Sequence, residues 1–489
     1  MTESFLNMLR CPRCGEIIVR DTIIQETDNE MEWGTLHCNS CDSKYPVAFG
    51  IPIMMPSNSY LDANENDITT SSLQKGILVS DVIREIEQGE IEKVKHDLLI
   101  YRRPRASKNG IPRLDGTLNL DNKLSRFLPH TLVKMAGKSN LQFVYWVLAR
   151  LSFQDRRLRK KEEKVFEKLL EDTSAIDFIY HYYHQLMHSP IYNYFTYRFG
   201  QPRYLVALSL LSTLPEDQKP ILDLACGTGH LIHYLTYRNS QQPVVGLERN
   251  FIKLYLAKEF IAPKGDFFCA EADQPLPFGN DTFSGVYCSD AFTYFTYISN
   301  SVREMKRIVN KDGVILITRV ASPSIPERIG DLRMTPFQLK SYFDDMQHIV
   351  VGEDELLERY IQKFGPDLST DLSAREFNKI GWMSIAATHR KNYFRDYGQF
   401  NDWPHVLGRL NLNPLYNEDG KDEKGKIILK FQFPSEWYEY ENHNWMKYAP
   451  KTILLSQSTM ESISKGTRTP EVNDLISKFV VLGMPQHYL

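Results

Sequence analysis

The chain contains 489 residues, of which 42% are hydrophobic and 24% are charged, and its net charge is −3. This is the composition of a globular protein with about two to four domains, and it gives no overall attraction to nucleic acid. No apolar run approaches the roughly 20 residues of a membrane helix and the N-terminus lacks a signal-peptide pattern, so we expect a cytoplasmic protein without a membrane partner.

Residues 1–56 carry two Cys-x-x-Cys pairs among the seven cysteines of the chain. In a reducing compartment such pairs are typical of a metal site rather than of disulfides. Four thiolates supply the tetrahedral coordination of structural zinc and leave no open position for catalysis. The sequence therefore predicts a zinc ribbon over residues 1–56, with Zn²⁺ bound by Cys11, Cys14, Cys38 and Cys41.

Residues 57–175 are expected to form a linker followed by a helical region. The segment begins with a polar, turn-rich stretch, and residues 81–101 and 161–174 have apolar side chains at helical spacing. Two short basic clusters, 101–105 and 156–161, could contact nucleic acid. Glutamates follow the second cluster at helical spacing, however, and this favours a solvated, salt-bridged helix face.

Between residues 176 and 395 apolar strands alternate with helices. This alternation predicts βαβ units and hence an α/β fold with a doubly wound, mostly parallel sheet. The expected strands are 220–227, 243–248, 266–272, 283–290, 313–320, 348–352 and 382–389. Residues 396–489 contain a further strand-like stretch after a turn-rich one, and we expect them to form an α+β cap.

The sequence ILDLACGTGH at 221–230 joins an expected strand to an expected helix. Dinucleotide sites use a GxGxxG loop, and here Gly227 and Gly229 are present while the third position is Ile232. Asp223 precedes the loop, where its charge would repel a pyrophosphate but suits the ammonium group of an amino acid. The loop therefore favours a methionine-bearing nucleoside over a dinucleotide.

The ends of the next two strands carry further acidic residues. Glu248 ends strand 243–248, where a carboxylate can accept hydrogen bonds from ribose hydroxyls, and both ligand classes contain a ribose. Glu271, Ala272 and Asp273 lie at the end of the third strand, where an adenine edge would lie. A dinucleotide has no comparable use for that stretch.

On the motifs LDLACGTGH, VVGLE, AEADQPLPFGNDTFSGVYCSDAF and EMKRIVNKDGVILI, in this order, the chain resembles the class I S-adenosylmethionine-dependent methyltransferases of the type 11 branch. The resemblance covers about residues 200–320 and extends toward 395. It implies that Asp223, Gly227 and Gly229 hold the methionine part of the cofactor, Glu248 the ribose, and Glu271 with Ala272 the adenine. We add Asp273 and Ser289 as cofactor-binding candidates.

Three features bear on catalysis. Methyl transfer is an in-line displacement at an activated carbon, so it needs a base only when the acceptor is a hydroxyl or a protonated amine. Asp290, at the end of the fourth strand, is the acidic candidate for this catalytic role, although it could equally cap the following helix.

Thr293 stands where relatives often carry histidine. The tyrosine-rich segment 179–205 is expected to cover the pocket as a lid.

With the stretch YPVAFGIPIMM at 45–55 after its cysteine pairs, the zinc ribbon resembles the small activator subunit of tRNA and translation-factor methyltransferases. In that family the ribbon stabilises a partner enzyme, largely through pairing at a sheet edge. Here it is fused to the enzyme, so the resemblance implies an internal partner.

These features predict a methyltransferase that uses S-adenosylmethionine and structural zinc and acts on a small-molecule or peptide acceptor. One alternative is an rRNA or tRNA methyltransferase, because zinc ribbons also occur in RNA-modifying enzymes. A second alternative is a non-catalytic protein that binds the cofactor or a partner. The expected domains are 1–56, 57–175, 176–395 and 396–489.

Overall fold

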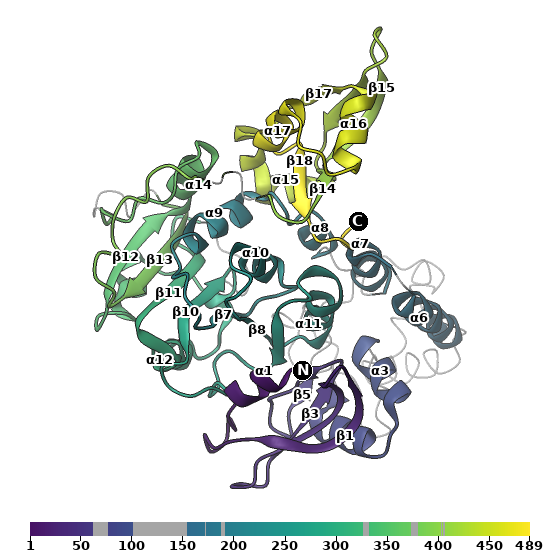
Figure 1. Cartoon of the computed structure of the whole chain (residues 1–489), viewed down its shortest axis with the longest axis vertical. Helices are drawn as coiled ribbons and strands as arrows, with labels where there is room; N and C mark the ends of the chain where they lie inside the picture. Colours follow the sequence, from purple (N-terminus) through teal and green to yellow (C-terminus); the bar gives the residue numbers. More distant parts are fainter. Residues whose placement is uncertain are drawn as a thin grey trace, which may run out of the picture.

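The structure is a computed structural model that describes residues 1–61, 77–100, 154–171, 173–186, 191–325, 332–372, 380–401, 403 and 406–489 (Figure 1). A central sheet lies between the N-terminal ribbon and the C-terminal cap. In the described parts of the chain, no helix has the length and apolar character needed to cross a membrane.

The central sheet has seven strands in the order β12-β13-β11-β10-β7-β8-β9. Strands β7 to β11 run parallel to one another, and β13 is antiparallel to both of its neighbours. The expectation of an α/β fold with a doubly wound, mostly parallel sheet is therefore confirmed. The strands are β7 (Ile221–Leu224), β8 (Val244–Glu248), β9 (Asp266–Cys269), β10 (Phe283–Ser289), β11 (Val309–Ala321), β12 (Gln347–Gly352) and β13 (Trp382–Thr388).

Helices cover both faces of this sheet, and each face is buried in its own hydrophobic cluster. Ile221 and Phe267 belong to one cluster, whereas Leu222 and Phe268 belong to the other. Neighbouring residues separate in this way because successive side chains of a strand point to opposite faces. The covering elements are α9 (Pro202–Leu211), α10 (His230–Arg238), α11 (Phe251–Leu256), η3 (Ala257–Ile261), α12 (Ile298–Ile308), α13 (Pro336–Ser341) and α14 (Glu353–Ile361).

The N-terminal ribbon extends the central sheet at its β9 edge. Met54 donates its backbone N–H to the Cys269 carbonyl at 2.8 Å, next to a parallel bridge between Ile53 and Cys269. Arg10 donates in the same way to Pro277 at 2.8 Å. The ribbon therefore covers backbone groups of an edge strand that would otherwise be open to pairing. Its elements are α1 (Glu3–Met8), β1 (Val19–Thr27), β2 (Glu30–His37), β3 (Lys44–Ala48) and β4 (Ile51–Pro52).

The region after the ribbon contains α2 (Val79–Glu87), α3 (Ile91–Leu99) and α6 (Gln154–Leu170), with a short β5 (Tyr60–Leu61) and β6 (Ile77–Leu78) pair before them. The periodic stretch 81–101 does not continue as one helix. It breaks at Gly89, whose φ of 76° lies in the left-handed region that favours glycine. The basic cluster 101–105 lies outside the described residues.

Three short helices precede α9 and form what we call the lid segment: α7 (Ala175–Ile179), the π-helical η2 (Tyr180–Leu186) and α8 (Ile191–Thr196). The C-terminal cap packs against the start of α9, where Gln201 donates from Nε2 to the Tyr438 hydroxyl at 3.0 Å (Figure 1). The cap contains β14 (Arg409–Leu412), β15 (Tyr416–Lys421), β16 (Ile427–Phe431), α15 (Glu436–Asn442), η5 (His443–Lys447), β17 (Thr452–Leu455), α16 (Gln457–Ser464), α17 (Pro470–Ser477) and β18 (Val481–Met484).

Candidate functional site

The glycine loop connects β7 to α10 through a run of left-handed residues. Ala225, Gly227 and Gly229 have φ values of 64°, 56° and 79°. A Cβ added to Gly229 would lie 2.8 Å from the Ala257 Cβ, so this glycine allows η3 to approach the loop. A Cβ added to Gly227 would meet no atom within 4 Å. The loop therefore exposes backbone to open space at Gly227, as a ligand-binding turn must.

Glu248 ties the end of β8 to this loop. Its Oε2 accepts the Gly227 N–H at 3.2 Å, and its Oε1 accepts the N–H groups of Arg249 at 2.9 Å and Asn250 at 3.1 Å. Burial raises the pKa of this carboxyl, and the three backbone donors act in the opposite direction. Lys253 Nζ lies 3.8 Å from Oε2. Glu248 thus stands beside Gly227, at the place where the sequence puts a ribose.

Asp223 lies at the same edge of the sheet, and its carboxylate is buried. The residue is 1% exposed, and among the described residues neither of its carboxylate oxygens has a hydrogen-bond partner. Burial raises its pKa to about 8, although Arg198 lowers it. An unpaired buried carboxylate is costly, so its presence points to a positively charged ligand that would satisfy it. The ammonium group of S-adenosylmethionine fits this requirement.

The three residues expected near the adenine differ in their surroundings. Glu271 is partly exposed, and its Oε1 lies 3.9 Å from Arg249 Nε. Ala272 is buried. Asp273 accepts the Tyr297 N–H at 3.0 Å and so holds the start of α12. Glu271 is the more open carboxylate of the pair, whereas Asp273 already has a structural partner.

Ser289 and Asp290 end β10 at the same sheet edge. Ser289 Oγ accepts a hydrogen bond from Thr318 at 3.0 Å. Asp290 Oδ2 accepts from the Tyr194 hydroxyl at 3.1 Å and from Arg203 Nη1 at 2.8 Å. Burial alone would raise the pKa of Asp290, but Arg203 and the other nearby arginines lower it below its ordinary value. A carboxylate held in this way is a weak proton acceptor, which disfavours a general-base role.

Sequence reasoning missed the charged residues that surround Asp290. Arg203 also binds Glu441 of the cap, with Nη2 3.0 Å from Oε2. Arg319 lies 3.3 Å from Glu353 through Nη1, and its guanidinium stacks 3.6 Å from the Trp382 ring. Arg319 interrupts the apolar run of β11, and this interruption is the sequence signal that could have identified it.

The four ribbon cysteines converge on one point. Cys11 Sγ lies 3.5 Å from Cys41 Sγ, Cys14 Sγ lies 3.4 Å from Cys38 Sγ, and all four sulfurs lie within 4.8 Å of one another. Tetrahedral coordination with Zn–S bonds of about 2.3 Å requires sulfur–sulfur separations of about 3.8 Å. The cluster therefore fits a structural zinc ion.

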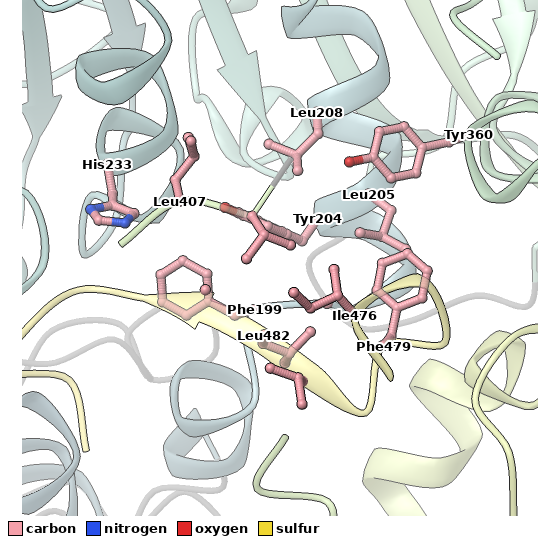
Figure 2. Close-up of a pocket in the computed structure, with 14 residues that line it drawn as sticks. Phe199, Tyr204, Leu205, Leu208, His233, Tyr360, Leu407, Ile476, Phe479 and Leu482 are labelled. Atoms are coloured by element: carbon pink, nitrogen blue, oxygen red, sulfur yellow. The ribbon is translucent and has the colours of Figure 1, made fainter. Parts of the chain in front are cut away.

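A small apolar cavity lies away from the strand ends, between α9 and the cap (Figure 2). Phe199, Tyr204, His233 and Leu482 are among the residues that line it, and its volume of about 30 Å³ has room for one or two water molecules. None of the expected cofactor-binding residues lines it. It is a packing gap between two parts of the chain and not the cofactor site.

Comparison with known proteins agrees with this geometry. A family model described as a methyltransferase domain matches residues 222–317, from β7 into β11. The uncharacterized methyltransferase YodH of Bacillus subtilis is 31% identical over 192 residues, which cover 38% of this chain and 77% of YodH. The chain belongs to this methyltransferase family.

Two further matches to this methyltransferase are weaker. The demethylmenaquinone methyltransferase of Thermotoga maritima is 25% identical over 129 residues, which cover 26% of this chain and 55% of the relative. Among solved structures, the complex between the Haloferax volcanii Trm112 methyltransferase activator and a putative methyltransferase is 17% identical, covers 38% of this chain and 90% of that chain, and has a TM-score of 0.31. The family match contains the glycine loop, Glu248 and Asp290 of this methyltransferase.

Proposed function

We propose that the chain is an S-adenosylmethionine-dependent methyltransferase that transfers a methyl group to a small-molecule or peptide acceptor by in-line displacement. The observation that carries the proposal is the Asp223 carboxylate, which is buried and has no hydrogen-bond partner among the described residues. A buried carboxylate without a partner in the protein is typical of a site where a bound ligand supplies the positive charge that pairs with it.

The other strand ends offer donors and acceptors in the order that the cofactor requires. Glu248 would accept hydrogen bonds from the ribose hydroxyls, and Gly227 and Gly229 would let the backbone approach the methionine part. We propose that Glu271, Ala272 and Asp273 border the adenine and that Ser289 lies on the far side of the pocket. When bound, the cofactor supplies a methyl group already activated by its sulfonium. The protein then needs mainly to align the acceptor and exclude water.

The acceptor side of the proposed site is formed by Asp290 and the lid segment. The Tyr194 hydroxyl reaches Asp290 from α8, and Arg203 fixes the same carboxylate. Because the arginines lower the pKa of Asp290, we propose that it contributes a fixed negative charge and not a proton-accepting group. This arrangement suits an acceptor atom that carries no proton at the moment of transfer.

We propose that the lid segment, from which Tyr194 contacts Asp290, encloses the site, and an enclosed site favours a small or flexible acceptor. The demethylmenaquinone methyltransferase relative, named for a small-molecule substrate, supports this choice. An RNA acceptor remains the competing function, and RNA binding tests it directly.

The zinc ribbon has a structural role in the proposal. Its four thiolates would occupy every coordination position of Zn²⁺, and its strand covers the edge of β9. The partner of the ribbon is thus internal to the chain. Persistent thiolates require a reducing compartment, so we place the enzyme in the cytoplasm.

Titration calorimetry with S-adenosylmethionine tests the proposal. We expect Glu248→Ala to weaken binding by roughly 1.5–3 kcal/mol, since the charged acceptor of two hydrogen bonds is lost. Glu304→Ala is the matched control, because Glu304 is also buried and accepts the backbone N–H of Leu276, at 2.7 Å, but its other contacts are with Arg307. Equal affinity of wild type and Glu248→Ala, or tight binding of NAD by the wild type, would contradict the proposal.

A further inference from the structure

A chain of buried hydrogen bonds connects the glycine loop to the last residues of the sequence. Thr228 lies between the two loop glycines, and its Oγ1 lies 2.9 Å from His230 Nδ1. His230 Nε2 lies 3.2 Å from the Tyr488 hydroxyl. That hydroxyl in turn lies 2.6 Å from the Phe195 carbonyl, at the end of α8. All four residues are at most 4% exposed.

We call this chain of hydrogen bonds the relay. The Phe195 carbonyl at its end decides which atom donates and which accepts in each of its bonds. The Phe195 carbonyl can only accept, so the Tyr488 hydroxyl donates to it. The hydroxyl oxygen then accepts from His230 Nε2–H, and Nδ1 of the same ring accepts from Thr228. Burial lowers the pKa of His230 far below its ordinary value, which keeps the ring neutral as this pattern requires. Every donor and acceptor of the relay is thereby satisfied.

The same C-terminal residues hold the other end of the lid segment. The carbonyls of His487 and Tyr488 accept the N–H groups of Ala175 at 2.8 Å and Ile176 at 3.0 Å, at the start of α7. Figure 1 shows the C-terminus beside α7 and α8. The C-terminal residues therefore contact both described ends of the lid segment.

The end of α8 lies against the proposed cofactor site. Tyr194 binds Asp290, and the Phe195 ring lies 6.0 Å from Lys253 Nζ, which itself lies 3.8 Å from Glu248. A shift of this turn would change the surroundings of two carboxylates at the strand ends. Thr228, at the opposite end of the relay, would move with the glycine loop.

We propose that Tyr488 is a positioning residue for the cofactor, whose hydroxyl fastens the end of α8 to the glycine loop. Cofactor affinity therefore depends on a C-terminal side chain that lies 258 residues from its His230 partner in sequence. The inference rests on the proposed function, because it assigns the consequence of the contact to S-adenosylmethionine binding.

Tyr448 provides a matched control for Tyr488. Its hydroxyl also donates to a backbone carbonyl, that of Gly200, at 2.8 Å, and the bond is partly buried. Its hydroxyl is not part of the relay to the glycine loop. Tyr448→Phe therefore removes a comparable hydrogen bond near the same region without touching the relay.

The experiment measures S-adenosylmethionine binding by calorimetry and amide hydrogen exchange of residues 191–196 without cofactor. For Tyr488→Phe we expect the Kd to rise about tenfold and exchange in 191–196 to accelerate, because one buried hydrogen bond is lost and its partners are left unsatisfied. Tyr448→Phe should keep the Kd within about twofold of wild type while losing similar stability. Thr228→Val should reproduce the Tyr488→Phe effects, and Thr228→Ser, which keeps the hydroxyl, should not.

The outcomes separate this inference from the proposed function. Wild type that does not bind S-adenosylmethionine would overturn the proposed function and the inference with it. Wild type that binds, together with an unchanged Kd for Tyr488→Phe, would overturn the inference alone. An equal loss of affinity in Tyr448→Phe would also overturn it, because the effect would then be general destabilisation. If Tyr488→Phe does not fold, an unchanged exchange rate of 191–196 in Thr228→Val would overturn the inference.

Discussion

Arg203 Nη1 lies 2.8 Å from Asp290 Oδ2, and this ion pair joins the beginning of α9 to the end of β10. Both side chains are largely buried, at 11% and 15% exposure. The pair places a fixed negative charge beside the proposed cofactor site and binds it to the lid segment through Tyr194. It also connects the sheet to the cap, because Arg203 binds Glu441.

Arg203→Met should destabilise the protein by about 3 kcal/mol, because it removes the cation that lies within 3.0 Å of two carboxylates, those of Asp290 and Glu441. Asp290 has a lowered pKa in the folded state, so its contribution to stability is present above the unfolded value and is lost as the pH falls through the folded one. The loss caused by Arg203→Met should therefore shrink in acid. Urea unfolding at pH 7 and at a pH below 3.8, the ordinary pKa of an aspartate, measures both effects. Lys478→Met, which removes an exposed pair with Asp474, should cost less than about 0.5 kcal/mol.

Asp223→Asn should stabilise the protein without cofactor while abolishing cofactor binding. Burial raises the pKa of Asp223 to about 8. As the pH rises, the carboxyl therefore loses its proton in the unfolded chain at a lower pH than in the folded protein. The free energy of unfolding consequently falls as the pH rises from about 4 toward 8. Replacing this carboxyl by a neutral amide removes the free-energy cost of keeping it protonated in the folded protein, which should recover on the order of 1–3 kcal/mol at pH 7. Thermal unfolding across this pH range measures the gain. A lower melting temperature for Asp223→Asn at pH 7 would contradict the assignment.

Cofactor binding should release a proton near pH 7. The positively charged ammonium would lower the raised pKa of Asp223, so the fraction of protonated carboxyl falls on binding. Calorimetry in buffers of different ionisation enthalpy measures the number of protons released. We expect a positive number at pH 7 that approaches zero at pH 9. A value independent of pH would mean that Asp223 does not face the bound ammonium.

Zinc removal should unfold the ribbon and lower the stability of the whole chain. We expect about one zinc per chain, lost in Cys38→Ser and retained in Cys288→Ala, whose thiol is buried in the central sheet. Because Met54 pairs with Cys269, loss of the ribbon also exposes the edge of β9, which should promote aggregation. Elemental analysis and light scattering measure these effects. Zinc-free wild type with unchanged stability would disprove the metal site.

RNA affinity should be weak at physiological salt. Phosphate contacts dominate RNA binding and need a continuous basic track, whereas this chain carries a net charge of −3. Filter binding against total cellular RNA should therefore detect no sub-micromolar complex. The control is a variant in which Arg156, Arg157 and Arg159 are changed to Ser. The structure does not describe the side chains of these three arginines. Tight, salt-sensitive binding that this variant loses would make RNA the favoured acceptor.

Local signals in the sequence were sufficient to locate the sheet and the glycine loop. Alternating strands and helices predicted the parallel sheet, and the two later apolar stretches correspond to β12 and β13. The two Cys-x-x-Cys pairs predicted a cluster that the structure brings together. These predictions succeed because residue spacing within a strand, turn or knuckle fixes the local geometry.

The sequence by itself thus determined the fold class, the glycine loop, Glu248 at the end of the second strand and the four thiolates. Only the tertiary structure decided that Asp290 is held by Arg203, 87 residues earlier, and that Tyr488 reaches the loop helix from 258 residues away. It also decided that Asp223 is buried without a partner among the described residues. The physical reason is that ion pairing and desolvation depend on which distant segments pack together, and no local periodicity records that packing.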